Sequence, residues 1–207
     1  MVGRKDKVKE MEEPLRIAPS RYGGHWTIED WKALDFSAEK GWQRAIDIFE
    51  DRIRYRFLVV VDAIQDYEFS GFAIMALDCL LIETLQQFYE GVHETSGQPR
   101  DYFKRFLTQP ALRKYFDGKM AECFYTHIRC GVLHQAEIKG SSRIRIDTPA
   151  LVRWADDRRG LVINRKRFHQ KLVEVFENYV AQLRDPTNQD PRAKFRDKMD
   201  AICRETS

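Results

Sequence analysis

The fold of this chain is decided by FSGFAIMALDCLLIETLQQFYEG, which occupies residues 69–91. Apolar side chains recur so densely between Phe72 and Leu85 that a helix built from this stretch has almost no polar face. Helices that are apolar nearly all round are normally buried, so we expect this helix to lie at the centre of a bundle. Gly91 predicts its C-terminal end, because glycine adopts the left-handed conformation that commonly closes a helix.

Helical patterns flank this stretch on both sides, because apolar residues recur there at helical spacing. Thr27 and Asp30 form a capping-box pattern that predicts the start of a short helix. Asn164 predicts the N-cap of the last long helix, because its side chain can accept a bond from the first turn. The expected helices after the capping box cover approximately residues 37–65, 69–90, 102–109, 119–137, 165–184 and 192–202.

The helical period stops after the helix that ends near residue 137. Residues 142–148 alternate apolar and polar side chains, and two short apolar runs flank the turn at residues 156–160. This pattern is typical of a β-hairpin. The sequence therefore predicts an all-α fold, an antiparallel helical bundle with a small β-hairpin insertion at about residues 142–164, before the last long helix. We expect residues 26–207 to form this domain and residues 1–25 to be a flexible N-terminal arm.

Composition indicates a soluble single-domain protein. Of 207 residues, 43% are hydrophobic and 32% are charged, and the formal net charge of +3 permits a polyanionic partner. The longest apolar run, residues 71–82, is too short to span a bilayer, and the N-terminus lacks the apolar segment of a secretory signal. The cysteines show no paired spacing, as is usual for reduced thiols. We therefore expect a cytoplasmic location and no membrane partner. The cysteines are Cys79, Cys123, Cys130 and Cys203.

An arginine and a histidine stand five positions apart in IRCGVLH, residues 128–134. Arg129 can hold a phosphate and His134 can move a proton, so the pair is a candidate catalytic site. In one regular helix the two would point about 140 degrees apart. They can share a site if Gly131 distorts the helix or if two copies of the chain meet and build a composite site. The alternative is a structural arginine and a packed histidine.

Two carboxylates in the central helix are candidate partners of Arg129. Asp78 and Glu83 both lie in the apolar stretch, where an unpaired charge is costly. Either one can pair with Arg129 and orient its guanidinium for a phosphate. Alternatively, the pair only holds the bundle together.

Cysteine and histidine alternate along one face of the predicted helix at residues 119–137. Such residues suggest zinc, but the first and last would lie about 16 Å apart along the axis, too far for one ion. A core or dimer-interface role is favoured, with Cys130 and His127 as supporting neighbours of the candidate pair, and we expect no metal and no cofactor. The stripe consists of Cys123, His127, Cys130 and His134.

The segment after this helix is basic, with nine Lys and Arg against three Asp between residues 139 and 167. It can follow an RNA backbone, with Trp154 or Phe168 to stack on bases. The alternative is an ordinary hairpin whose edge is protected by solvated charges. The candidate RNA-binding residues are Arg143, Arg145, Arg158, Arg159, Arg165, Lys166 and Arg167.

FYTHIRCGVLHQAE at residues 124–137 and ALDCLLIETLQQFYEG at residues 76–91 together resemble a HEPN domain. The resemblance covers roughly residues 37–184 and rests on the helix order, the acidic central helix and the R-x-x-x-x-H segment. It implies a helical bundle, a homodimer with a composite site, and Arg129 and His134 as the catalytic pair. Two positions depart from active members: Cys130 follows the motif arginine, and Ala136 replaces the tyrosine of a toxin subgroup.

The resemblance implies a metal-independent endoribonuclease that cleaves RNA by attack of the 2′-hydroxyl. It also implies a defence or toxin–antitoxin context, with an antitoxin or regulatory protein as a possible partner. A histidine with an ordinary pKa near 6.5 suits proton transfer at neutral pH. The alternative function is a non-catalytic helical module for dimerisation or for binding RNA or protein.

Overall fold

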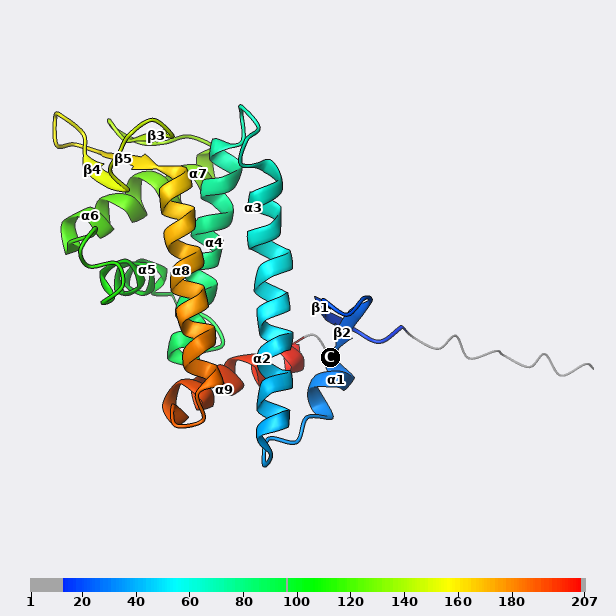
Figure 1. Ribbon diagram of the computed structural model, residues 1–207. Helices are drawn as coiled ribbons and strands as arrows, with labels where there is room; N and C mark the ends of the chain where they lie inside the picture. The colour runs from blue at the N-terminus through cyan, green and yellow to red at the C-terminus, as the bar shows by residue number, and fades with distance from the viewer. Residues whose placement is uncertain (1–12, 96, 206–207) are drawn as a thin grey trace, which may run out of the picture.

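The computed structural model describes residues 13–95 and 97–205. Its central element is helix α4, which packs against the neighbouring helices α5, α8 and α9 and meets α2 through the rings of Phe88 and Phe49. In Figure 1 the α2–α3 rod, α4 and α8 run alongside one another, and α9 crosses near one end. The central position expected for this apolar helix is confirmed, and Gly91 ends it in the left-handed conformation. These helices are α2 (Glu39–Ile53), α3 (Val59–Ile64), α4 (Gly71–Glu90), α5 (Pro99–Thr108), α8 (Arg165–Arg184) and α9 (Gln189–Glu205).

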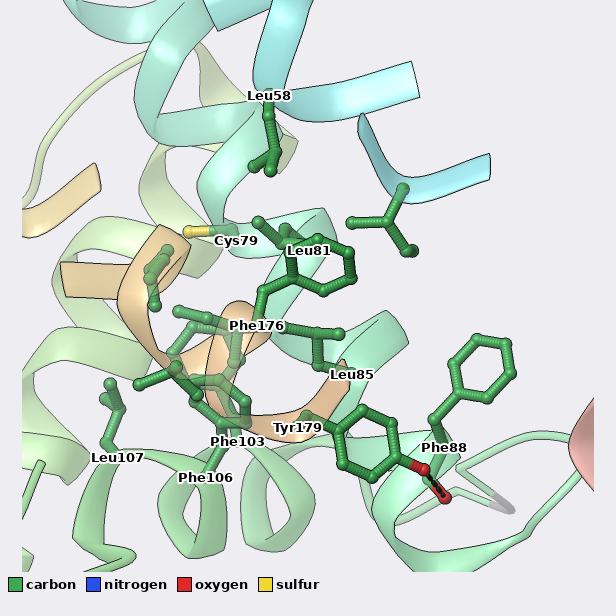
Figure 2. Close-up of a cluster of buried hydrophobic side chains, with 14 of the residues drawn as sticks. Leu58, Cys79, Leu81, Leu85, Phe88, Phe103, Phe106, Leu107, Phe176 and Tyr179 are labelled. Atoms are coloured by element: carbon green, nitrogen blue, oxygen red, sulfur yellow. Dashed lines mark hydrogen bonds between the residues drawn. The ribbon is translucent and has the colours of Figure 1, made fainter. Parts of the chain in front are cut away.

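Interlocking aromatic rings fill the core between these helices. The Phe49 ring lies 4.5 Å from that of Phe88 and 5.8 Å from those of Phe176 and Tyr179, measured between centroids. Figure 2 shows Phe88, Phe176 and Tyr179 converging from α4 and α8. The buried Tyr179 hydroxyl donates to the Phe88 carbonyl at 3.2 Å, so its polar end is satisfied. Each such side chain contributes about 1.5–3 kcal/mol by leaving water, which explains why the aromatic-rich segments form the bundle.

A three-stranded sheet interrupts the helices, so the prediction of an all-α fold was wrong. The molecule is mainly helical but mixed α/β. β5 forms an antiparallel hairpin with β4, as the alternation indicated, but β3 pairs with β5 in parallel on its other side. Asn164 fixes this crossover, because its side-chain amide donates to the carbonyls of Ile146 and Thr148 while its oxygen caps α8. The strands are β3 (Arg143–Arg145), β4 (Val152–Trp154) and β5 (Leu161–Asn164).

A second small sheet lies at the N-terminus, within the arm predicted to be flexible. Strands β1 (Arg16–Pro19) and β2 (His25–Thr27) pair in antiparallel fashion and lead into α1 (Ile28–Lys32). Thr27 and Asp30 form the predicted capping box. Residues 16–19 and His25 of the predicted arm therefore lie in a paired sheet, which corrects the expectation for that part of the arm, and residues 1–12 lie outside the described residues.

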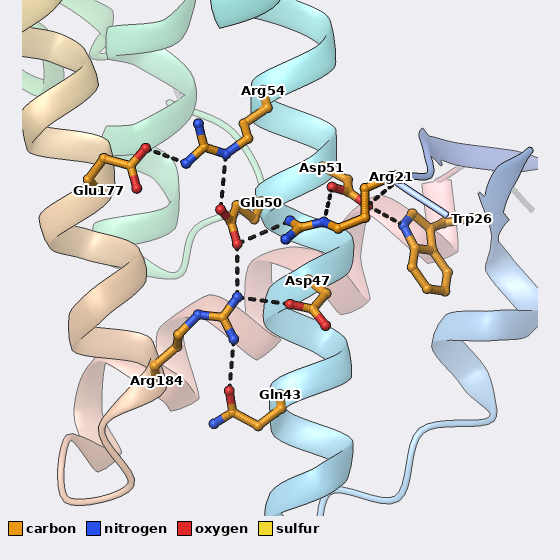
Figure 3. Close-up of polar contacts among 9 residues, drawn as sticks. All are labelled: Arg21, Trp26, Gln43, Asp47, Glu50, Asp51, Arg54, Glu177 and Arg184. Atoms are coloured by element: carbon orange, nitrogen blue, oxygen red, sulfur yellow. Dashed lines mark hydrogen bonds and ion pairs between the residues drawn. The ribbon is translucent and has the colours of Figure 1, made fainter. Parts of the chain in front are cut away.

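A buried carboxylate holds this N-terminal sheet on α2, as Figure 3 shows. Asp51 accepts from the Arg21 guanidinium at 2.6 Å and from the Trp26 indole at 2.8 Å. Beside it, Glu50 pairs with Arg184 of α8 at 2.8 Å. These contacts join segments far apart in sequence, which is why a local reading of the N-terminus missed them.

α4 is long and apolar enough, by length and composition, to cross a membrane, but half of that window is buried inside the fold. The core helix of a soluble protein has the same properties. The structure is consistent with the predicted soluble character of the protein.

Candidate active site

The candidate site lies where a distorted helical rod meets α4. The rod consists of α6 (Gly118–Cys123), a π-helix η2 (Phe124–Arg129) and α7 (Cys130–Gln135). In the π-turn the Cys130 amide donates to the Tyr125 carbonyl, five residues back, which widens the helix by one residue. The distortion therefore includes Arg129 and ends before Gly131, the residue at which the sequence suggested it.

Gly131 has a different role, because it lets the following turn fold back onto the helix. A Cβ added there would lie 2.3 Å from the Glu137 carbonyl oxygen, closer than real atoms approach. The Glu137 amide donates to the Gly131 carbonyl at 3.2 Å, and Ala136 adopts a left-handed conformation with φ of 51°. This tight reversal ends α7 at Gln135, one residue after His134.

Arg129 and His134 are in direct contact within a single chain. Arg129 Nη1 lies 3.1 Å from His134 Nε2, and Arg129 Nε donates to Glu83 Oε1 at 2.6 Å. The length of the arginine side chain bridges the angle that separates the two positions on the helix. Of the two acids considered from the sequence, Glu83 is therefore the partner of Arg129.

The charges at this site are well defined. Burial opposes the charge on Arg129, but the hydrogen bond and the charge of Glu83 outweigh it and raise the arginine pKa. A guanidinium can only donate hydrogen bonds, so Nε2 of His134 is the acceptor in this contact. The Arg129 and Glu83 side chains are 13% and 16% exposed, whereas His134 is exposed, so the site opens to solvent at the histidine.

Tyr125 belongs to the site although the sequence reading did not single it out. The Arg129 guanidinium lies 5.4 Å from the Tyr125 ring centroid, and the Arg100 guanidinium lies 5.6 Å from it. The half-buried Cys130 thiol is a hydrogen-bonding neighbour of both Tyr125 and Arg129. The signal available in the sequence was the four-residue spacing from Tyr125 to Arg129, which places both on one helix face.

Asp78 lies apart from this site. Its Oδ1 is 2.6 Å from Nδ1 of His169 on α8, and both side chains are buried. Burial raises the pKa of the Asp78 carboxyl, against the opposing effect of His169. Asp78 Oδ2 and His169 Nε2 lack any hydrogen-bond partner among the described residues. The prediction that Asp78 supports Arg129 was wrong, because His169 takes that carboxylate.

His127 also faces away from the pair and makes a separate polar cluster. Its Nδ1 lies 3.6 Å from Cys123 Sγ and 3.2 Å from Ser142 Oγ. Burial raises the pKa of the Cys123 thiol, which disfavours its nucleophilic thiolate form. Within residues 13–95 and 97–205, no three His, Cys, Asp or Glu side chains gather in an arrangement that could hold a metal ion.

Most of the predicted RNA-binding residues are exposed on or beside the three-stranded sheet. An open groove of about 640 Å³ is lined by Arg143, Arg145 and Arg153, but Asp147, Asp156 and Asp157 line it as well. Phe168 is fully buried in the core and therefore cannot stack on a base as proposed from the sequence. Arg165 is buried too, whereas the six exposed candidates are Arg143, Arg145, Arg158, Arg159, Lys166 and Arg167.

Comparison with known proteins gives no family assignment. No family model matches the chain, and neither a curated protein nor a solved structure matches it. The function is therefore argued from the site itself.

Proposed function

We propose that this protein is a metal-independent endoribonuclease of the HEPN type, with Arg129 and His134 as its catalytic pair. The observation that carries the proposal is the 3.1 Å contact between a partly buried guanidinium, held by Glu83, and an exposed imidazole. This places a fixed positive charge beside a proton-transfer group at the surface. A phosphodiester needs both groups at its scission point.

In the proposed reaction, His134 accepts the proton of a ribose 2′-hydroxyl at Nε2, the nitrogen that accepts from Arg129 in the free protein. The 2′-oxygen forms a bond to phosphorus, the bond to the 5′-oxygen breaks, and that oxygen leaves as a hydroxyl after protonation. Arg129 donates to the phosphate oxygens as charge develops on them. The products are a 2′,3′-cyclic phosphate and a 5′-hydroxyl, so neither water nor a metal takes part in the scission.

A homodimer would supply a second histidine to protonate the leaving oxygen, as in a composite site. The α3–α4 hairpin offers a face for it, because Val59 is 48% exposed and Leu80 is 43% exposed. Leu80 precedes Glu83 by three residues, so this apolar face borders the candidate site. Replacement Leu80→Glu should convert a dimer to a monomer in light scattering. Leu15→Glu, at a residue 50% exposed beside β1, is the control, and a parent protein that is monomeric at high concentration contradicts the dimer.

Cleavage of single-stranded RNA in EDTA tests the activity. The parent protein should cleave RNA and leave an all-deoxy strand intact, because only RNA carries the nucleophile. His134→Ala should abolish cleavage, and Arg129→Lys should reduce it because lysine lacks the planar fork. His25→Ala, at an exposed histidine of β2, is the matched control. Equal cleavage by the His134→Ala variant would reject the proposed pair.

A second candidate function is a non-catalytic helical module that binds RNA or a partner protein. The burial of Arg129 against Glu83 supports this alternative, because the same ion pair can serve stability alone. Under it, the parent protein would bind RNA without cleaving it. Arg129→Ala would lower stability by leaving the Glu83 carboxylate unpaired, whereas His134→Ala would change neither stability nor RNA binding.

The resemblance to HEPN domains supports a cytoplasmic protein of a defence or toxin–antitoxin system, held in check by an antitoxin or regulatory protein. The basic surface around Arg143 and Arg158 supports RNA as its substrate class. These assignments depend on the activity and are proposed with it.

A further inference from the structure

A groove separate from the Arg129–His134 pair lies between the start of α4 and strand β3. It encloses about 750 Å³. Large apolar side chains at its rim are exposed to solvent: Phe69 is 75% exposed, Ile146 is 57% exposed and Phe72 is 40% exposed. Clustered exposed apolar side chains around a hollow mark a binding site. The lining residues are Glu68, Phe69, Gly71, Phe72, Ile144, Arg145, Ile146, Asp147 and Arg165.

Arg165 gives this groove its chemical character. The residue is only 6% exposed, and its guanidinium donates to the Ser70 hydroxyl at 3.0 Å. It forms no ion pair with any carboxylate in the described part of the chain. The equally buried Arg192, in contrast, is held by Glu39 at 2.7 Å. A buried cation without a carboxylate is costly, so the groove is set up to receive an anion.

The other charges around the groove largely cancel. Arg145 and Asp147 bind each other through two hydrogen bonds of 2.9 and 2.7 Å. Lys166 pairs with Asp66 at 2.6 Å, outside the groove lining. Glu68 is exposed at the rim, where solvent screens its charge. Arg165 interacts with Asp66 only through longer-range attraction and has no carboxylate of the described residues in direct contact, so it carries the least compensated charge of the groove.

The start of α8 strengthens the positive potential at this point. Arg165 is the first residue of this 20-residue helix, and its first turn contains no acidic residue. The N-terminal end of a helix is already positive, so a cation placed there is unfavourable unless an anion lies nearby. The N-terminus of α8 and the Arg165 side chain thus both favour an anionic ligand.

We propose that this groove binds one nucleotide of a single-stranded RNA, with the base against Phe69 and Phe72 and the phosphate on Arg165. Aromatic side chains stack on any base, and a guanidinium binds phosphate through a planar fork. Tyr67 supports Phe69, because their rings meet edge to face at 6.0 Å. Ile144 and Ile146 form the opposite, apolar wall.

The groove lies on the same helix as the candidate active site. Phe72 and Glu83 are both on α4, eleven residues and thus about 16 Å apart along the axis. A strand anchored at Phe72 is therefore held near the Arg129–His134 pair. The RNA source of the nucleotide rests on the proposed function, but binding in the groove can be measured without cleavage.

The test uses a fluorescently labelled RNA octamer with 2′-O-methyl groups, which cannot be cleaved, and measures Kd by anisotropy at fixed salt. Phe69→Ala should weaken binding at least about fivefold, the lower end of what one stacked base contributes. Arg165→Lys should also weaken it, because the charge stays and the fork is lost. Tyr22→Ala, at an aromatic residue 69% exposed in the N-terminal sheet, is the matched control.

AMP, measured by calorimetry with the same variants, separates the two sources of a nucleotide. Binding of the octamer that is much tighter than that of AMP, and lost in Phe69→Ala, supports an RNA strand. Equally tight AMP binding that is lost in Phe69→Ala supports a free nucleotide in the same groove. Octamer and AMP affinities unchanged in both variants, or no binding by the parent protein, would overturn the inference. The 2′-O-methyl octamer reports binding whether or not the protein cleaves RNA, so failure of the nuclease leaves this result independent.

Discussion

The Arg129 guanidinium makes one contact at each of two edges: Nε donates to Glu83 Oε1 at 2.6 Å, and Nη1 lies 3.1 Å from Nε2 of His134. The first contact is shielded and fixes the side chain, and the second faces solvent. A phosphate that enters the site would compete only for the second edge. The free protein therefore keeps its cation in place beside the candidate base before any substrate arrives.

Replacement Glu83→Gln should lower RNA cleavage at least about tenfold, because Arg129 loses the charge that positions it. It should also cost about 1–3 kcal/mol of unfolding free energy, since the guanidinium is mostly buried. Initial rates and urea melts measure the two effects. Glu90→Gln is the control on the same helix, where Glu90 pairs with Arg105 at 2.8 Å. An unchanged rate in Glu83→Gln would limit that ion pair to a structural role.

Replacement Gly131→Ala should destabilise the protein by about 1–3 kcal/mol, the usual cost of overpacking. The new methyl group would meet the Glu137 carbonyl oxygen at 2.3 Å and push the turn after His134 outward. Gly118→Ala is the matched control, because nothing lies within 4 Å of a Cβ there. It should be neutral or stabilising by about 0.4–1 kcal/mol. Equal melting temperatures for the two variants would contradict the close approach at Gly131.

The buried pair of Asp78 and His169 should behave as one unit. Asp78→Leu or His169→Leu alone should each cost about 1–3 kcal/mol, because each leaves a buried polar partner without its hydrogen bond. The double replacement should cost less than the sum of the two, since it removes both polar groups. Urea unfolding of all four proteins measures the coupling. Additive losses would mean that the two residues act independently.

Stability should depend on pH through Glu39. Its hydrogen bonds with Arg192 and Gln43 lower its pKa from 4.5 to about 2. A lowered carboxyl pKa stabilises the folded state above the unfolded value of 4.5, and this contribution disappears as the pH falls toward 2. Glu39→Gln should therefore melt below the parent at pH 7 and approach it near pH 2. Glu13→Gln, whose carboxylate side chain is 81% exposed, should show no such convergence.

The parts of the fold that the sequence predicted depend on local signals. The burial of residues 71–90, the stop at Gly91 and the caps at Thr27 and Asn164 all follow from neighbouring residues. Pairing between distant segments was missed. β3 pairs directly with β5 in parallel although β4 lies between them in the sequence, and the N-terminal sheet depends on Asp51 of α2. Because those partners are far away in sequence, no local pattern distinguishes them from loops.

In the candidate site, too, the sequence predicted what depends on neighbouring residues and missed what depends on distant segments. The Arg129–His134 pair lies within one helix and could be found from its spacing. Glu83 was one of the two acids of the central helix that the sequence offered as a partner of Arg129. The choice between Glu83 and Asp78 required the position of His169, which is 91 residues from Asp78. The burial of Arg165 and Phe168 likewise depends on how α8 packs. Exposed and buried cations look alike in a sequence.

The π-turn of η2 makes the length of its helix matter as much as its residues. Loss of a single codon between Phe124 and Arg129 would let the backbone return to a regular α-helix with better hydrogen bonds. Because the wide turn takes up one residue more than an α-helical turn, the segment after it would keep its orientation toward α4 in spite of that loss. Straightening of the same helix at unchanged length would instead rotate every residue beyond the turn by about 100 degrees. His134 would then turn away from the Arg129–Glu83 pair, so the wide turn keeps the two motif positions on the same side of the helix.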